Sequence, residues 1–257
     1  TVFKALAERL PNEDLLYLGD TARLPYGTKG RDTIIRYSLL AARKLVERRI
    51  KMLVIACNTA TATALPTLRQ ELAPLPVLGV VEPGARAAAA ATRNGEIAVI
   101  ATEATVRSGV YQKAIETVRP DARTRAKVCT LFVSMAEEGL MEGPLAEGIA
   151  RHYLDGIFGD DAEPPRPDTL LLGCTHFPLF KAALKNVVGP GVSVVDPAST
   201  VAETVERELA ARSLLRTGGD APSRRFMTTD NRERFARTGS LFLGGDLPPE
   251  KIELVDL

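Results

Sequence analysis

The sequence predicts an α/β protein with mainly parallel sheets, built as two similar three-layer domains with a cleft between them. Three observations carry this prediction. Short aliphatic runs alternate along the chain with amphipathic stretches, and the aliphatic runs lack the polar alternation of half-exposed strands. In addition, two of the runs, far apart in the chain, lead into a cysteine in similar surroundings.

The aliphatic runs are the expected strands, and each contains mostly branched residues. Runs of this kind are typical of strands that are buried on both faces of a parallel sheet. They occupy residues 15–18, 52–56, 77–81, 97–101, 170–172 and 192–195.

The stretches between these runs have helical spacing. Residues 31–49 place Ile34, Leu39 and Ala42 on one stripe and put basic residues elsewhere. Residues 2–9, 105–118, 144–158 and 199–215 have similar patterns. Strands alternating with helices predict βαβ units. The tail after residue 216 has Gly-Gly breaks around short apolar runs and gives no clear pattern.

Two proline-containing turns divide the chain. They are Glu82-Pro83-Gly84 and Asp196-Pro197-Ala198, and each directly follows an expected strand. The segment between them has a length within the usual range of a domain. We therefore expect a discontinuous first domain, residues 1–82 plus 197–257, and a second domain, residues 83–196.

Composition excludes several classes of protein. The net charge of +1 provides no strong field that would attract nucleic acid or an anionic membrane surface. No apolar run approaches the roughly 18–20 residues that span a bilayer, and the first residues lack a signal-peptide pattern. Three widely spaced cysteines do not form a disulfide framework. A reducing cytoplasm is the expected location, where thiols remain free.

Two of those thiols stand in matching positions. Met52-Leu53-Val54-Ile55-Ala56-Cys57-Asn58-Thr59 resembles Leu170-Leu171-Leu172-Gly173-Cys174-Thr175-His176. In each, a buried strand passes through one small residue into a cysteine, then into polar residues and a helix. One cysteine lies in each expected domain, so we expect the two thiols to face each other.

This placement suits acid–base chemistry. Ligands of open parallel sheets bind at the carboxyl ends of strands, and helix N-termini favour anions. We therefore expect both cysteines to have a lowered pKa and a substrate carboxylate to bind beside them. A thiolate on one face of a carbon and a thiol on the other can invert a stereocentre. The two cysteines must then be in opposite protonation states at any moment, so we expect their titrations to be coupled.

Other polar residues are candidates with open alternatives. His176 can assist one thiol, and Glu137 or Glu138 can orient an imidazole, although both glutamates also suit a solvated helix. Asp20 follows an expected strand, close to the Pro25-Tyr26-Gly27 turn, and could equally stabilise that loop. Cys129 and His152 are interpreted as structural residues.

A metal site is disfavoured by the spacing of its conceivable ligands. Cys57, Cys174 and His176 form a conceivable set, but structural zinc sites prefer closely spaced cysteine pairs. Phosphate-binding glycine motifs are absent. We therefore expect neither metal nor nucleotide.

Together the motifs resemble those of the glutamate racemase family, within the aspartate/glutamate racemase superfamily. Thr-His after the second cysteine is the glutamate-type pattern, whereas aspartate racemases usually have Thr-Glu. The segments that carry the resemblance are residues 19–27, 56–61, 76–84, 101–106 and 171–179.

The resemblance implies a bacterial cytoplasmic enzyme that makes D-glutamate for peptidoglycan without pyridoxal phosphate or metal. It implies that Cys57 and Cys174 are the acid–base pair and that His176 and Glu137 assist Cys174. It also implies a pocket that holds the carboxylates and ammonium group of the substrate, lined by Pro25, Tyr26, Gly27, Asn58, Thr59, Thr102, Thr105 and Thr175. A homodimer is expected, and some family members are reported to bind DNA gyrase.

The sequence departs from the family pattern in two places. Family members begin with a strand and an Asp-Ser-Gly loop that supplies an aspartate beside the first cysteine, and neither is present here. We expect that such a segment was removed or not recorded, and that without it racemisation is severely reduced. Restoring it should then increase turnover. The segment after Cys129 also lacks the usual prolines.

Two other functions stay open from sequence. The chain could be another racemase of the superfamily, of aspartate or hydantoin type; a decarboxylase of this fold would keep only one cysteine. Alternatively it could be a catalytically impaired regulatory or binding protein on a racemase scaffold. Exchange of the Cα proton of glutamate in D₂O separates the enzymes from the binding protein.

Overall fold

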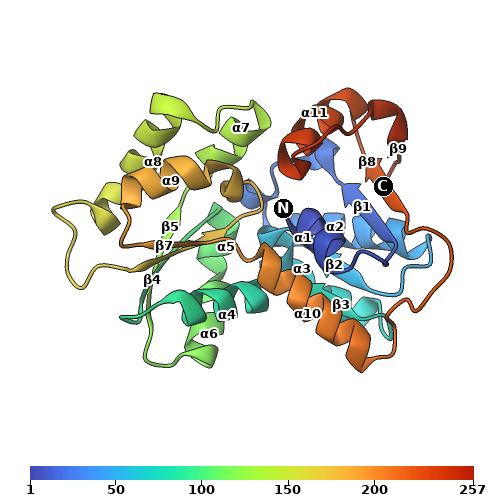
Figure 1. The fold of residues 1–257 in the computed structure, drawn as a ribbon, viewed down its shortest axis with the longest axis horizontal. Helices are drawn as coiled ribbons and strands as arrows, with labels where there is room; N and C mark the ends of the chain where they lie inside the picture. Colours follow the sequence, from blue (N-terminus) through green and yellow to red (C-terminus); the bar gives the residue numbers. More distant parts are fainter.

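Every sheet of the protein is parallel, and the strands lie in two lobes that stand side by side (Figure 1). The computed structural model describes residues 1–257. The α/β class expected from the sequence is confirmed, because helices cover both faces of parallel strands.

The second lobe contains one four-stranded sheet with the order β5-β4-β6-β7. Its strands are β4 (Glu96–Ala101), β5 (Arg123–Val128), β6 (Thr169–Gly173) and β7 (Ser193–Val195). Its helices are α4 (Val81–Ala91), α5 (Glu103–Ser108), α6 (Val110–Val118), α7 (Leu131–Glu137), α8 (Gly143–Phe158) and α9 (Lys181–Val188), with a 3-10 turn η3 (Phe177–Phe180).

Side chains of the central strand β4 alternate between two cores. Ala98 and Ile100 pack with residues of α7, α8 and α9, whereas Ile97 and Val99 pack with α4 and α6. All residues of this strand are buried. The strand is therefore the middle of three layers, which explains why its sequence is apolar without alternation.

The first lobe contains two separate sheets, β2-β3 and β1-β8-β9. Its strands are β1 (Leu15–Gly19), β2 (Leu53–Ile55), β3 (Val77–Gly79), β8 (Arg224–Thr228) and β9 (Ile252–Leu254). Its helices are α1 (Val2–Arg9), α2 (Arg31–Val46), α3 (Asn58–Glu71), α10 (Ala198–Ala211) and α11 (Arg232–Leu243), with 3-10 turns η1 (Thr21–Arg23), η2 (Tyr26–Thr28) and η4 (Pro249–Lys251).

Helices also enclose the sheets of the first lobe. Helices α1 and α10 share one buried cluster, and α2 and α3 share another with β2 and β3. Helix α11 packs Phe235 and Ala236 against Ile252 of β9. Strands β1 and β2 do not pair with each other, so each has one edge without a strand partner.

The six strands predicted from aliphatic runs are all present, and three further strands were not predicted. The expected helix over 105–118 is broken at Gly109, whose φ of 64° is left-handed, so α5 and α6 are separate. The turns taken as domain limits lie at the N-terminal ends of α4 and α10, which pack against each other. The domain limits themselves remain a prediction.

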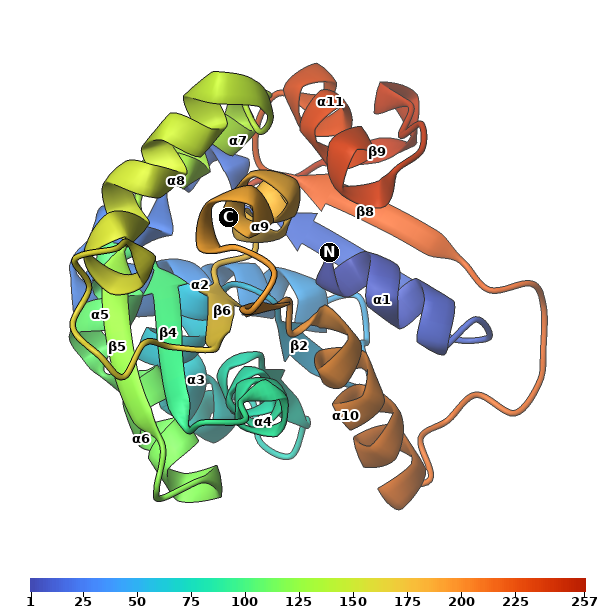
Figure 2. The same ribbon diagram turned by 60° about the vertical axis from the view of Figure 1, so that its left-hand side comes forward.

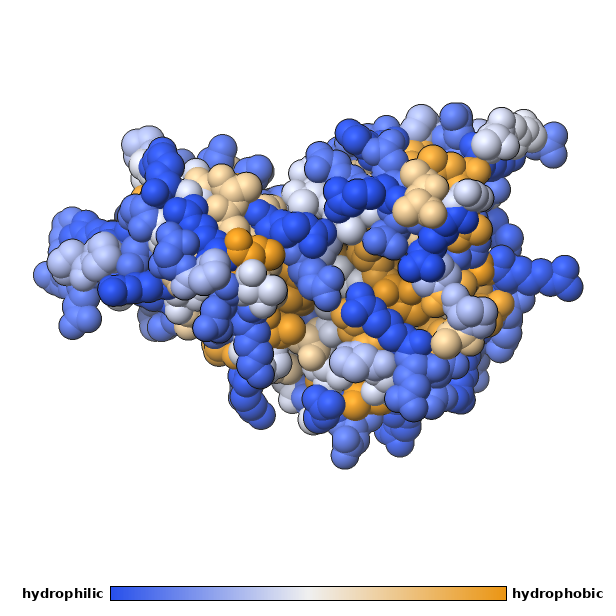
Figure 3. Space-filling model, turned by 90° about the horizontal axis from the view of Figure 1, so that it is seen from below, coloured by the Kyte–Doolittle hydropathy of each residue, from blue (hydrophilic) through white to orange (hydrophobic).

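No helix combines the length and the apolar character that crossing a bilayer requires. Seen from below, the surface is mostly hydrophilic on both lobes and has an apolar patch on the first lobe (Figure 3).

Candidate active site

Both candidate cysteines lie just beyond the carboxyl end of a strand. Cys57 comes after β2 and is the N-cap of α3, where its Sγ accepts a hydrogen bond from the backbone N–H of Ala60 at 3.4 Å. Cys174 follows β6. This is the position at which parallel sheets hold ligands.

The two lobes bring the neighbours of both cysteines to one small cavity of about 10 Å³. Ala56 and Asn58, on either side of Cys57, line it from the first lobe, and Cys174 and Thr175 line it from the second. Cys174 lies close enough to Cys57 for a negative charge on its sulfur to raise the pKa of Cys57. The cavity therefore lies between the segment that carries Cys57 and the segment that carries Cys174.

The expectation of a lowered pKa is wrong for Cys57. Burial raises the pKa of its thiol to about 11, because desolvation outweighs the hydrogen bonds from Ala60 and Thr59 that favour the thiolate. The helix N-terminus thus contributes donors, but it does not compensate for the loss of water. Cys57 is a thiol at neutral pH.

Cys174 has a charged partner. The Nδ1 of His176 lies 3.9 Å from the Sγ of Cys174, and its Nε2 donates a hydrogen bond of 2.9 Å to Glu137 on α7. Burial opposes a charge on His176, but the contacts with Cys174 and Glu137 outweigh it and raise its pKa to about 9. The hydrogen bond from His176 in turn lowers the pKa of Glu137.

His176 is therefore an imidazolium at neutral pH, with one N–H directed to a carboxylate and the other to sulfur. This cation lies beside the sulfur of Cys174. The two cysteines thus have unlike environments: Cys57 is half-buried and has no positively charged partner, whereas Cys174 is buried and faces an imidazolium.

Three threonine hydroxyls meet between the lobes. Thr59 of α3 lies 2.9 Å from Thr102 and 3.3 Å from Thr105, oxygen to oxygen, and Thr102 and Thr105 are 3.2 Å apart. All three residues are buried. Such a cluster offers several donors and acceptors to a polar ligand.

Asn58 is oriented by a tyrosine of the second lobe. The hydroxyl of Tyr111 on α6 donates a hydrogen bond of 2.5 Å to Oδ1 of Asn58. Tyr111 is fully buried, and burial raises its pKa. Its hydroxyl therefore stays protonated and acts as a fixed donor, which leaves the amide N–H₂ of Asn58 free for a ligand.

The loop after β1 is held by Asp20. Its Oδ1 accepts hydrogen bonds from Arg23 and Thr229, both at 2.9 Å, and its Oδ2 accepts one of 2.5 Å from Tyr26. This loop carries Pro25, Tyr26 and Gly27. Gly27 lies so close to Thr102 of the second lobe that any Cβ there would overlap it.

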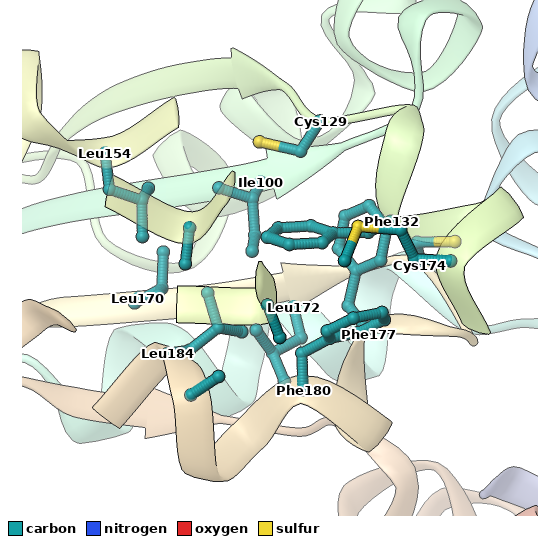
Figure 4. Close-up of a cluster of buried hydrophobic side chains, with 14 of the residues drawn as sticks. Ile100, Cys129, Phe132, Leu154, Leu170, Leu172, Cys174, Phe177, Phe180 and Leu184 are labelled. Atoms are coloured by element: carbon teal, nitrogen blue, oxygen red, sulfur yellow. The ribbon is translucent and has the colours of Figure 1, made fainter. Parts of the chain in front are cut away.

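Cys129 and His152 lie outside this arrangement, as interpreted from sequence. Cys129 is fully buried in the core of the second lobe, and Figure 4 shows it apart from Cys174, which lies beside Phe132 and Phe177. His152 is exposed on α8. No cluster of three histidine, cysteine or carboxylate side chains is arranged to hold a metal ion.

Sequence reasoning missed several residues of this region. Tyr111 is in a predicted helix but gives no local signal of its partner. Arg234 and Phe242 contact Glu137 and His176 from α11, in the tail whose pattern was unclear. No local signal in the tail pointed to these two contacts.

The comparisons with known proteins agree with this geometry. Residues 1–205 match the family model described as Asp/Glu/Hydantoin racemase. A glutamate racemase of Geobacter metallireducens is 46% identical over 247 residues, which cover 96% of this chain and 89% of the relative.

Solved structures give the same result. The glutamate racemase of Francisella tularensis in complex with D-glutamate has a TM-score of 0.88 at 33% identity, covering 99% of this chain and 92% of that one. The Thermus thermophilus glutamate racemase in complex with beta-chloro-D-alanine has a TM-score of 0.84 at 40% identity, covering 100% and 92%. The chain belongs to the Asp/Glu/hydantoin racemase family, among its glutamate racemases.

Proposed function

We propose that the protein interconverts L- and D-glutamate by moving protons between the substrate Cα and the thiols of Cys57 and Cys174. The observation that carries this proposal is the unlike pair of cysteines at strand ends of two facing lobes. It is supported by the D-glutamate complex of the Francisella tularensis relative.

In this proposal the Cys174 thiolate takes the Cα proton from one face of the substrate. The bond from Cα to hydrogen breaks, an S–H bond forms on Cys174, and Cα keeps the electron pair. The Cys57 thiol then donates its proton to the opposite face, which forms the other enantiomer and leaves a thiolate on Cys57. The raised pKa of Cys57 makes that thiolate a strong base, ready for the reverse direction.

Surrounding residues have binding roles in the same proposal. Asn58, Thr59, Thr102, Thr105 and Thr175 provide amide and hydroxyl groups for the carboxylates and ammonium of glutamate. Pro25, Tyr26 and Gly27 form one wall of the pocket. We assign Asp20 the role of orienting Tyr26 in that wall, since both of its oxygens already accept hydrogen bonds.

The cellular role follows from the product. We propose that the enzyme works in the cytoplasm, where its three free cysteines stay reduced, and supplies D-glutamate to peptidoglycan. We also propose a homodimer, because Leu131, Leu140 and Leu145 are exposed apolar side chains around α7 and the start of α8. Sedimentation of the purified protein measures this state.

One experiment tests the reaction and the two thiols. Circular dichroism should show racemisation of both glutamate enantiomers, with L- and D-aspartate turned over at least about a hundredfold more slowly. In D₂O, the Cα of glutamate should acquire deuterium. Cys57→Ser and Cys174→Ser should each lower kcat by about a thousandfold or more, whereas Cys129→Ser should not. Full activity in either of the first two variants refutes the two-thiol mechanism.

A further inference from the structure

Helix α11 reaches from the first lobe to the pair formed by His176 and Glu137 in the second lobe. The ring of Phe242 packs edge-on against the His176 imidazole, with centroids 5.7 Å apart and planes at 81°. The guanidinium of Arg234 lies 3.9 Å from Oε2 of Glu137 and 3.7 Å from Oε1 of Glu138. Figures 1 and 2 both place α11 next to α7.

The anchoring of α11 does not require these two side chains. Its buried residues Phe235 and Ala236 pack with Leu247 and Ile252 in the first lobe. Arg234 is exposed, and Phe242 is only half-buried. One face of the helix thus holds it in the first lobe, while two side chains about two turns apart contact the second lobe.

The two contacts act on different parts of the same pair. Oε1 of Glu137 accepts the hydrogen bond from His176, and Oε2 faces Arg234, so the carboxylate is held from both sides. Phe242 packs against the imidazole in a T-shaped contact, which limits the rotation of the imidazole and its contact with water. Rotation of the ring would move Nδ1 away from Cys174.

Charged and titratable groups face Glu137 from each element that packs against it. Arg234 and Arg237 of α11 favour its ionised form, as does His176, while Tyr17 of β1 lies close enough for the charge of Glu137 to act on it. Glu138 shares the guanidinium of Arg234. Among the arginines of α11, Arg234 is the one that forms an ion pair with Glu137. It does so at Oε2, the oxygen that His176 does not contact.

We propose that Arg234 and Phe242 are positioning residues that hold the His176–Glu137 pair in line with Cys174 across the interface between the lobes. The proposal rests on the proposed racemase function and deepens it. It predicts that Cys174 reaches its full rate of proton transfer only while α11 of the first lobe contacts the second lobe.

The test uses paired variants of the full chain. Arg234→Gln and Phe242→Leu each remove one of the two contacts. Arg234→Lys and Phe242→Tyr keep the charge and the ring, respectively. As a control, Arg232→Gln removes an exposed charge from the same helix. We expect kcat for glutamate to fall about five- to tenfold in the two disruptive variants, with KM within about twofold. The conservative variants should recover most of this loss.

The pH profile separates positioning from simple packing. Loss of the Arg234 charge raises the pKa of Glu137, so the acid limb of kcat/KM should move to higher pH by about 0.3–0.7 unit in Arg234→Gln. It should stay in place in Arg234→Lys and in Arg232→Gln. An unchanged limb with unchanged kcat, or an equal effect of Arg232→Gln, overturns the proposal.

A second measurement does not depend on turnover. The Nε2–H proton of His176 should give a protected NMR resonance in the wild-type protein and in Arg232→Gln, and this resonance should broaden or disappear in Arg234→Gln and Phe242→Leu. If the wild-type protein fails to racemise glutamate, the proposed function is wrong, but this resonance still decides whether α11 positions the imidazole. Equal protection in all variants refutes the positioning role.

Discussion

Replacing Glu137 with glutamine removes the negative charge beside His176 and keeps the size of the side chain. In the wild-type protein the pKa of His176 is raised from its ordinary 6.5 to about 9. This difference corresponds to about 3 kcal/mol of stabilisation of the charged imidazole. Glu137 accepts one of the two hydrogen bonds that the imidazole of His176 makes. We therefore expect Glu137→Gln to lower the pKa of His176 by about 1–2 units.

The effect on stability depends on pH with a definite sign. Because the pKa of His176 is raised, protonated His176 stabilises the fold. This contribution is fully present below the ordinary pKa of 6.5 and is lost as pH rises through about 9. The pKa of Glu137 is lowered, so its contribution is present above its ordinary 4.5 and is lost as pH falls below that value. We therefore expect Glu137→Gln to lower the free energy of unfolding by about 1–3 kcal/mol near pH 6 and by much less above pH 9.

Two measurements check this. The protein has two histidines, so NMR titration resolves His176 from the exposed His152, and His152→Gln assigns the signals. Urea unfolding of wild type and variant at several pH values gives the stability difference. A wild-type His176 that titrates near 6.5, or a stability difference that does not shrink as pH rises, would refute the reasoning.

Three further predictions concern other parts of the site. In a variant in which Cys57 is the only cysteine, alkylation by iodoacetamide should accelerate about tenfold per pH unit up to pH 10, because the pKa is about 11; a plateau near pH 8.5 would contradict this. Gly27→Ala should lower kcat/KM by about tenfold or more, since a methyl group there overlaps Thr102, whereas Gly30→Ala meets nothing and should be neutral. Tyr111→Phe leaves a buried amide oxygen without its donor and should lower the free energy of unfolding by about 1–3 kcal/mol in urea titrations; an unchanged value would argue against that hydrogen bond.

The missed strands show where sequence patterns lose information. β5 reads Arg-Thr-Arg-Ala-Lys-Val and lies at the edge of its sheet, so its exposed side carries basic residues and no aliphatic run forms. β9 has only three residues. Buried central strands such as β4 and β6 were predictable because both of their faces must be apolar.

The sequence by itself determined the α/β class, the position of each cysteine at a strand end and the pairing of His176 with the second cysteine, since these are local patterns. The tertiary structure decided the properties that depend on surroundings from distant segments. Burial between the lobes raises the pKa of Cys57 against the local effect of its helix N-terminus. The contacts of Arg234 and Phe242 likewise bring the end of the chain to the middle of it. Desolvation and long-range contacts depend on all the residues that surround a group in the folded protein, and many of these come from distant parts of the sequence. Local spacing in the sequence therefore does not predict them.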